Sequence, residues 1–295
     1  MFKDFRETFC AGATVLLFLS GCPRPFVAAA TPDSQAPPAR EAVSKMEGSL
    51  REDFAPGRFE GSNGVRLVYR LLTPPKPGER VPLVVMLHGS GAIGDDNLAQ
   101  LGDFSLSWAQ LEIRHWFHAY VLVPQFPART ADYSSDELPA SIARPPLDAA
   151  LELVDSICRT LPIDQDRIYV VGFSMGGSAA WHALLRRPDR FAAMVSISGV
   201  PPDRSLAATI PTVPLLLIHG TEDRENPFAA TKAMVEKLQG FPRKELLWQP
   251  IRGLGHAIPQ EVIHGTWWRD WLFAQRRPGK ADQPPTIRTS APPPQ

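Results

Sequence analysis

Gly172-Phe173-Ser174-Met175-Gly176 is the stretch that decides the fold, because of what flanks it on each side. The residues before it, 167–171, read Arg-Ile-Tyr-Val-Val, a run typical of a buried parallel strand. Residues 177–185 follow with a composition typical of a helix. A G-x-S-x-G motif between a strand and a helix is typical of a nucleophile elbow, a sharp turn that exposes the serine hydroxyl above a sheet. The sequence therefore predicts Ser174 as a nucleophile, with a plain strand-to-helix turn as the alternative.

Two residues further along the chain fit the partners that such a serine needs. A serine hydroxyl becomes a nucleophile when a base takes its proton and an acid orients that base. With an elbow serine, the acid and then the histidine follow in chain order. Asp223 follows a strand-like run at 214–219, and His256 follows another at 246–251. We expect Asp223 to be the acid and His256 the base, since the spacings of 49 and 33 residues each leave room for one strand–helix unit.

Other acidic and histidine side chains compete for these roles. Asp223 could only cap the helix expected after Pro227, as an acidic residue near a helix start often does. Its acidic rivals are Glu222, Glu225 and Asp203. Of the other histidines, two precede a glycine at a strand end, where a structural role is favoured: His88 and His219. The rest fall in helix-like or surface stretches: His115, His118, His182 and His264.

Acyl transfer also requires donors aimed at the oxyanion that develops on the substrate. The N–H of Met175, directly after the nucleophile, is one candidate, and the loop after an early strand supplies the other. The strand-like run 82–87 leads into His88-Gly89-Ser90-Gly91. We expect the Ser90 N–H to be the second donor, with Gly89 as the near alternative and a glycine-rich turn without a catalytic part as the other. We expect no metal and no cofactor, since the chain has no metal-ligand spacing of His and Cys.

The middle of the chain alternates between strand-like and helix-like runs. This alternation predicts an α/β fold with a mostly parallel, doubly wound sheet covered by helices on both faces. The strand-like runs are 65–72, 82–87, 119–123, 167–172, 192–197, 214–219 and 246–251. The expected helices are 147–160, 176–187, 227–239 and 261–275. The irregular segment 125–146 either walls a pocket or is a surface excursion.

These motifs, in this order, resemble the esterase and "predicted peptidase" branch of the α/β-hydrolases, which is related to polyhydroxybutyrate depolymerases and feruloyl esterases. Besides the elbow, the resemblance rests on residues 87–97, 123–125, 188–191, 219–223, 255–256 and 270–275. It implies Ser174 as nucleophile, Asp223 as acid, His256 as base, and the loop after His88-Gly89 as half of the oxyanion hole. Relatives often carry D-x-x-V-P after the acid strand, and Asn226 here replaces the valine.

The N-terminal residues predict export, and the residues at both ends of the chain are expected to lie outside the folded domain. Residues 1–22 resemble a signal peptide ending in a lipobox, Leu19-Ser20-Gly21-Cys22, which predicts a lipid anchor at Cys22 in the cell envelope. The alternative is cleavage after Ala30, which gives a secreted or periplasmic protein. Residues 23–55 are expected to be a flexible proline-rich tether, 56–277 the hydrolase domain, and 278–295 a disordered proline-rich tail. With Cys10 in the signal and Cys22 lipidated, Cys158 has no partner for a disulfide.

The leading hypothesis is a serine carboxyl ester hydrolase that acts through an acyl-enzyme on short-chain or aryl esters, small or derived from polymers. A peptidase with the same three residues is the alternative, since these residues do not fix the leaving group. A non-catalytic surface binding lipoprotein is the third hypothesis. The 31 basic and 31 acidic residues give a net charge of zero, so nothing indicates a nucleic-acid partner.

Overall fold

The computed structural model describes residues 49–76, 78–242 and 245–277. The predicted signal peptide with Cys22, most of the predicted tether and the predicted tail 278–295 lie outside these residues. Among the helices of the described part, none combines the length and the apolar character needed to cross a bilayer.

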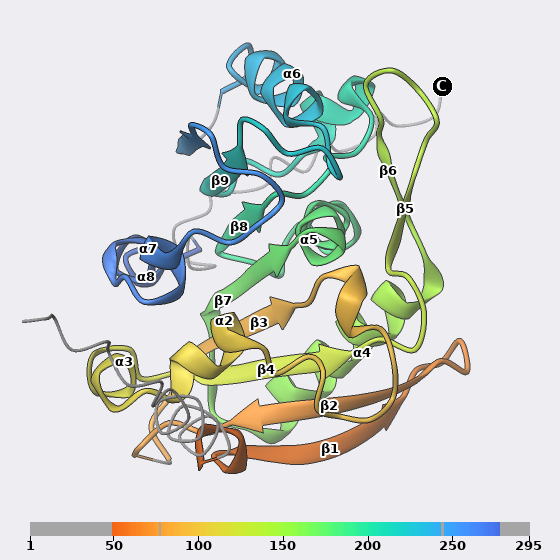
Figure 1. The fold of residues 1–295 in the computed structure, drawn as a ribbon. Helices are drawn as coiled ribbons and strands as arrows, with labels where there is room; N and C mark the ends of the chain where they lie inside the picture. The colour runs from red at the N-terminus through yellow and green to blue at the C-terminus, as the bar shows by residue number, and fades with distance from the viewer. Residues whose placement is uncertain (1–48, 77, 243–244, 278–295) are drawn as a thin grey trace, which may run out of the picture. The chain divides into compact units, whose positions relative to one another are not determined.

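An eight-stranded sheet forms the centre of the fold, in the order β1-β2-β4-β3-β7-β8-β9-β10 (Figure 1). The strands are β1 (Phe54–Glu60), β2 (Arg66–Leu72), β3 (Val81–Leu87), β4 (Tyr120–Gln125), β7 (Ile163–Phe173), β8 (Ala193–Ile197), β9 (Leu215–Gly220) and β10 (Leu246–Ile251). Strand β2 pairs antiparallel with β1 and β4, and all the other pairs are parallel. The mostly parallel sheet predicted from the sequence is confirmed.

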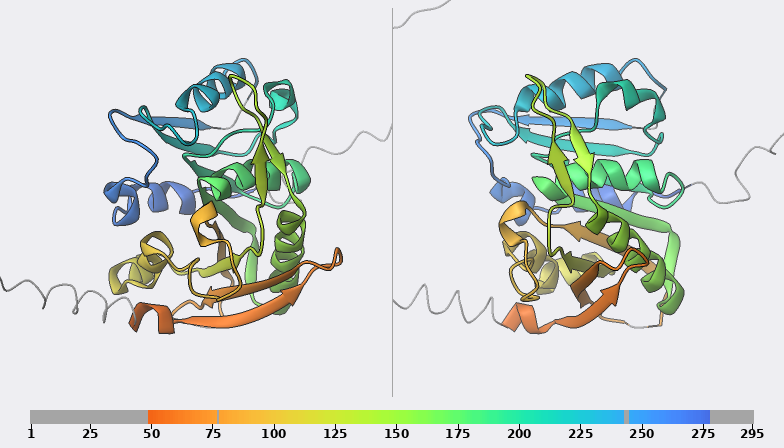
Figure 2. Two further views of the ribbon diagram at one scale, coloured as in Figure 1. Left: turned by 45° about the vertical axis from the view of Figure 1, so that its right-hand side comes forward. Right: turned by 90° about the vertical axis from the view of Figure 1, so that its right-hand side faces the viewer.

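Helices cover both faces of this sheet (Figure 2). One face carries α4 (Pro145–Thr160), α5 (Met175–Arg186) and α6 (Phe228–Leu238); the other carries α2 (Asp103–Leu106), α3 (Leu111–Trp116), α7 (Gln260–Ile263) and α8 (Trp267–Phe273). Strand β3 shows how the sequence divides the two cores. Leu83 and Val85 pack with α4 and α5, whereas Val84 and Met86 pack on the opposite face, because successive side chains of a strand point to opposite sides.

The structure differs from the sequence-based expectations in several local elements. Strand β1 begins at Phe54, so the predicted domain start at residue 56 falls inside it. Segment 125–146 contains a small antiparallel hairpin of β5 (Ala131–Tyr133) and β6 (Ser141–Ala143). The single helix expected at 261–275 is two helices separated by residues 264–266, and Gly265 in this break has no room for a side chain, since a Cβ would lie 2.1 Å from the Glu261 carbonyl oxygen. Cys158 is free and half-buried on α4, and burial raises the pKa of its thiol.

Candidate active site

Ser174 occupies the sharp turn between β7 and α5. Its backbone has φ 56° and ψ −120°, a conformation that non-glycine residues seldom adopt. Two hydrogen bonds hold it there: the Ser174 N–H donates to the Ile197 carbonyl at 2.9 Å, and the Ser178 N–H donates to the Ser174 carbonyl at 2.9 Å. The predicted turn is therefore present, and hydrogen bonds to β8 and α5 hold its strained backbone conformation in place.

The two glycines of the motif allow α5 to approach the sheet closely. A Cβ on Gly172 would lie 2.1 Å from the Gly176 carbonyl oxygen. A Cβ on Gly176 would lie 2.0 Å from the carbonyl oxygen of Leu87, at the end of β3. Neither position has room for a side chain, so the start of α5 packs directly on the backbone of β3.

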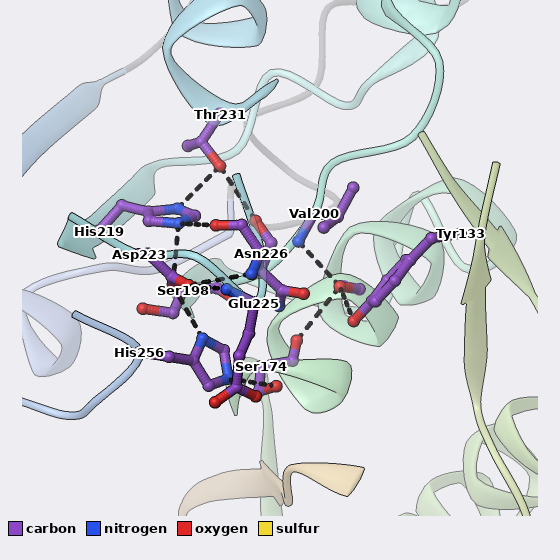
Figure 3. Close-up of polar contacts among 12 residues, drawn as sticks. Tyr133, Ser174, Ser198, Val200, His219, Asp223, Glu225, Asn226, Thr231 and His256 are labelled. Atoms are coloured by element: carbon purple, nitrogen blue, oxygen red, sulfur yellow. Dashed lines mark hydrogen bonds and ion pairs between the residues drawn. The ribbon is translucent and has the colours of Figure 1, made fainter. Parts of the chain in front are cut away.

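The structure brings Ser174, His256 and Asp223 into one line of hydrogen bonds (Figure 3). His256 Nε2 lies 2.8 Å from Ser174 Oγ, and His256 Nδ1 lies 2.8 Å from Asp223 Oδ2. Asp223 follows β9 and His256 follows β10, and these parallel neighbours end at the same edge of the sheet. The arrangement lets the hydroxyl donate to Nε2 while Nδ1–H donates to the carboxylate. Geometrically, the serine can lose its proton to the histidine, and the aspartate can hold the resulting imidazolium.

The Asp223 carboxylate is fully buried and is held by several donors. Its Oδ1 accepts the backbone N–H groups of Glu225 at 3.0 Å and Asn226 at 2.9 Å. The Asn226 side chain donates to the Ser198 carbonyl at 2.6 Å. The asparagine that replaces the family's valine therefore ties the acid loop to the loop after β8, a bond that valine cannot make.

His219 is a second histidine in contact with this carboxylate, and sequence reasoning gave it only a structural role. Its Nε2 lies 2.9 Å from the Asn226 carbonyl oxygen and 3.2 Å from Asp223 Oδ2, and its Nδ1 lies 3.0 Å from Thr231 Oγ1. Burial lowers the pKa of His219 more than these acceptors raise it, so the ring is neutral and Nε2–H is the donor. His219 lies four residues before Asp223 on the same strand end, and this spacing was the available signal.

The acidic rivals of Asp223 are placed elsewhere. Asp203 accepts from the Ser205 N–H at 2.7 Å and so caps the short 3₁₀ helix η3 (Arg204–Thr209). Glu222 is exposed. The Glu225 carboxylate lies 3.7 Å from His256 Nε2, the nitrogen that faces the serine, and its side chain is 74% exposed. Of these four described carboxylates, Asp223 is the one in contact with Nδ1.

The two expected oxyanion donors belong to segments that border Ser174. Met175 is the first residue of α5, and Ser90 opens the 3₁₀ helix η1 (Ser90–Ala92) after Gly89. A Cβ on Gly89 would lie 3.4 Å from Ser174 Cβ, so this loop borders the nucleophile. Within the described residues, the N–H groups of Ser90 and Met175 donate to no other protein atom. Both remain available for a negatively charged oxygen.

His88 fixes the orientation of this loop. Its Nε2 accepts the Phe126 N–H at 3.0 Å, so its Nδ1–H donates to the Gly89 carbonyl at 2.7 Å. Burial lowers the pKa of His88, which keeps the ring neutral. The Ala92 N–H also donates to the Gly89 carbonyl. In a trans peptide the N–H points away from the carbonyl, so these bonds hold the Ser90 N–H toward the other side.

The fold contains another serine–histidine contact, between a residue of the β5–β6 hairpin and a residue of α5. Ser141 Oγ lies 2.9 Å from His182 Nε2, and both residues are buried. No acidic partner of His182 is found in the part of the chain that the structure describes. The pair ties the β5–β6 hairpin to α5, which indicates a structural role.

A cavity of about 440 Å³ opens beside the His256 ring. Its walls come from the end of β3 and the loop after it, the segment 99–105, Phe173 and the residues that follow His256. The Phe173 and His256 rings lie 5.0 Å apart, centre to centre. The volume is in the range of small-molecule sites.

The sheet, the elbow and this line of three residues define the α/β-hydrolase fold with a candidate Ser-His-Asp triad. Residues 74–265, more than half of the chain, match the phospholipase/carboxylesterase family, and the chain belongs to that family.

Individual relatives agree with this assignment. The chain is 28% identical over 232 residues to a protein of Nocardia uniformis subsp. tsuyamanensis named "Putative esterase NocK", over 74% of this chain and 61% of the relative. It is 31% identical over 115 residues to acyl-protein thioesterase 1 of Schizosaccharomyces pombe, over 37% of this chain and 51% of that protein. A solved structure of a thermostable esterase superposes with a TM-score of 0.70 at 28% identity, covering 78% of this chain and 64% of that one. The chain thus spans less than two thirds of the length of each of these relatives.

Proposed function

We propose that this protein hydrolyses short-chain or aryl carboxylic esters through an acyl-enzyme on Ser174. One observation carries the proposal: Ser174 Oγ, the His256 ring and the Asp223 carboxylate are joined by two hydrogen bonds of 2.8 Å. The adjacent N–H groups of Ser90 and Met175 supply the charge stabilisation that acyl transfer needs.

The reaction runs in two halves. Ser174 Oγ attacks the ester carbon while its proton passes to His256 Nε2, and the carbonyl oxygen takes its negative charge between the two N–H groups. The tetrahedral intermediate collapses, the leaving alcohol takes the proton from Nε2, and an ester of Ser174 remains. Water then gives a proton to Nε2 and its oxygen to the acyl carbon. The carboxylic acid leaves, and Ser174 regains its proton from His256.

The substrate class is supported by the cavity beside His256. Its volume of about 440 Å³ and its largely apolar walls suit a compact aliphatic or aryl group. Hydrolysis of an amide additionally requires that a poor leaving amine be protonated in line by the same Nε2. We therefore propose that esters react far faster than peptide amides.

Kinetics of three variants test the proposal. Ser174→Ala and His256→Ala should abolish turnover of p-nitrophenyl acetate, and Asp223→Asn should lower kcat about 10⁴-fold, because it favours the wrong imidazole tautomer. Asp203→Asn is the matched control, since that carboxylate only caps η3, and its kcat should stay at the wild-type value. An active Asp223→Asn beside an inactive Asp203→Asn would refute the acid assignment.

A substrate panel tests the leaving group. The value of kcat/KM should fall from acetyl and butyryl esters to long acyl chains, and it should be lower still for peptide amides. A preparation that cleaves a peptide amide as efficiently as its best ester would instead make the protein a peptidase.

We also propose that the protein is exported and anchored by lipid at Cys22 in the cell envelope. The apolar run before Leu19-Ser20-Gly21-Cys22 supports this, and so does the distance of the competing site at Ala28-Ala29-Ala30 from that run. One acyl chain anchors only marginally, so several chains on Cys22 are expected. Mass spectrometry of the mature N-terminus is the test: a lipidated Cys22 supports the proposal, and an unmodified Thr31 start contradicts it.

A further inference from the structure

A second carboxylate lies beside the nitrogen of His256 that faces the serine. Glu225 Oε2 is 3.7 Å from His256 Nε2, which is hydrogen-bonded to Ser174 Oγ. Figure 3 shows the Glu225 side chain reaching down beside the imidazole ring. Asp223 orients the opposite nitrogen, Nδ1, so Glu225 takes no part in that task. The Glu225 side chain is 74% exposed, and the reaction described above assigns it no role.

The backbone of Glu225 is held in place although its side chain is exposed. The Glu225 N–H donates to Asp223 Oδ1 at 3.0 Å, and the Asn226 N–H donates to the same oxygen at 2.9 Å. The Asn226 side chain in turn donates to the Ser198 carbonyl at 2.6 Å. The charge of Glu225 is therefore carried by a loop that is anchored to the catalytic acid, and the reach of one side chain limits how far it can move.

The charge around His256 is negative, although the whole chain has a net charge of zero. Among the described residues, no lysine or arginine forms an ion pair with Glu225. The cavity beside His256 is lined by a further carboxylate, Asp103, which is exposed at the start of α2. None of the described residues that line this cavity is a lysine or an arginine, and burial lowers the pKa of His88 in its wall, so that ring is neutral. These charges attract a cation to the entrance of the site and repel an anion.

The position of Glu225 indicates which half of an ester it meets. His256 Nε2 gives its proton to the leaving oxygen, so that oxygen comes within hydrogen-bond distance of Nε2, about 3 Å. Because Glu225 Oε2 lies 3.7 Å from the same nitrogen, the carboxylate and the leaving oxygen are at most about 7 Å apart. A positive charge two or three bonds along the alcohol from the leaving oxygen can therefore contact the carboxylate.

We propose that Glu225 selects esters whose leaving alcohol carries a positive charge, an amine or a quaternary ammonium group. The inference rests on the esterase function proposed above and names the substrate class of the same site. The carboxylate pairs with the cation while the ester carbon lies at Ser174 Oγ. An exposed ion pair of this kind raises kcat/KM by up to about fivefold, and an anion at the same place meets repulsion of similar size.

Two pairs of esters of matched shape test which half of the substrate Glu225 meets. Acetylcholine and 3,3-dimethylbutyl acetate differ in the charge on the alcohol half. Ethyl 4-(trimethylammonio)butanoate and ethyl 5,5-dimethylhexanoate differ in the charge on the acid half. For each pair, the ratio of kcat/KM for the charged ester to kcat/KM for the neutral ester is measured in the wild type and in Glu225→Gln. Comparing the two enzymes cancels the intrinsic reactivity of the esters.

For the alcohol pair, we expect the ratio to be about fivefold higher in the wild type than in Glu225→Gln. For the acid pair, the two enzymes should differ by less than about twofold. A larger dependence on Glu225 in the acid pair would place the carboxylate on the acyl side and overturn the assignment. Equal ratios for the alcohol pair in the two enzymes would overturn it as well.

Further variants separate the position of the charge from its presence. Glu222→Gln is the matched control, because it removes an exposed carboxylate from the same loop that forms no ion pair with His256 in the described structure, so the wild-type ratio should persist. Glu225→Lys should lower the ratio for the alcohol pair below that of Glu225→Gln. In the wild type, raising the NaCl concentration to about 1 M shortens the Debye length to about 3 Å and should bring the ratio toward that of Glu225→Gln. A wild-type ratio that does not respond to salt contradicts the proposal.

Failure of this inference and failure of the esterase function give different results. A wild-type enzyme that hydrolyses these esters with the same ratio as Glu225→Gln refutes only the role of Glu225. A wild-type enzyme that hydrolyses none of them refutes the esterase function, and the inference with it.

Discussion

Replacing Gly176 by alanine should reduce activity and stability together, because this residue sets the distance between α5 and β3. The added Cβ would lie 2.0 Å from the Leu87 carbonyl oxygen and 2.8 Å from the His88 carbonyl oxygen. A tolerated contact between carbon and oxygen begins near about 3.3 Å, so the two backbones must separate by about 1.3 Å. Both oxygens belong to backbone that leads directly into Gly89 and Ser90, so the second oxyanion donor moves with them.

The size of the effect follows from this displacement. A misplacement of about 1 Å in a catalytic constellation costs on the order of 10²-fold in rate. We expect Gly176→Ala to lower kcat/KM for p-nitrophenyl acetate by about that factor. Overpacking of this kind also lowers the free energy of unfolding by about 1–3 kcal/mol.

Steady-state kinetics and urea unfolding measure both effects. Gly240→Ala is the matched control, because its Cβ would meet only the Lys237 carbonyl oxygen at 3.4 Å, in ordinary van der Waals contact. The control should match the wild type in both assays. A Gly176→Ala enzyme with wild-type kcat/KM would refute the argument that this contact positions the oxyanion loop.

Two further predictions concern stability. Burial lowers the pKa of His88, His182 and His219, so these rings are neutral in the folded state while the unfolded chain takes up their protons near pH 6.5 and below. The free energy of unfolding should therefore decline as pH falls below about 6.5, by up to about 4 kcal/mol per pH unit for the three histidines together. Urea titrations between pH 5 and 6.5 should show a shallower decline for His182→Gln than for the wild type. An equal slope in the two proteins would contradict this account. The Arg269 guanidinium is fully buried against the rings of Trp108 and Trp268, and burial lowers its pKa to about 9. Arg269 Nη1 donates to the Gly265 carbonyl, and its Nη2 donates to Ser107 Oγ at 2.6 Å. Lysine has one nitrogen in place of these two and no planar group to stack on the rings, so Arg269→Lys should lower the free energy of unfolding by about 3 kcal/mol. An unchanged urea midpoint would refute this role.

The buried strands could be predicted from the sequence because each is a continuous apolar run, as a parallel strand covered on both faces must be. Strand β1 escaped prediction because it contains Pro56 and Gly57, which are tolerated at the edge of a sheet but do not indicate a strand. The helices α2 and α3 have four and six residues, too few to show a helical period.

The candidate site was likewise only partly predictable from the sequence. Chain order placed Asp223 and His256, because the acid and the histidine follow successive strands of a parallel sheet. The contact of His219 with Asp223 depends on how the chain folds back after the end of β9. The four-residue spacing between the two residues was the one sequence signal for this contact, and it does not by itself distinguish a contact with the acid from a purely structural role.

Covalent labelling tests the central claim, that Ser174 is the nucleophile of an esterase, most directly. The enzyme is treated with a fluorophosphonate, which phosphonylates activated serines, and the modified peptide is mapped by mass spectrometry. We predict a single label on Ser174, formed in parallel with the loss of ester turnover, and no label on Ser174→Ala. Ser141, hydrogen-bonded to His182, is the internal comparison, because its histidine has no acidic partner among the described residues. A label on Ser141 instead, or undiminished turnover by Ser174→Ala, would contradict the account.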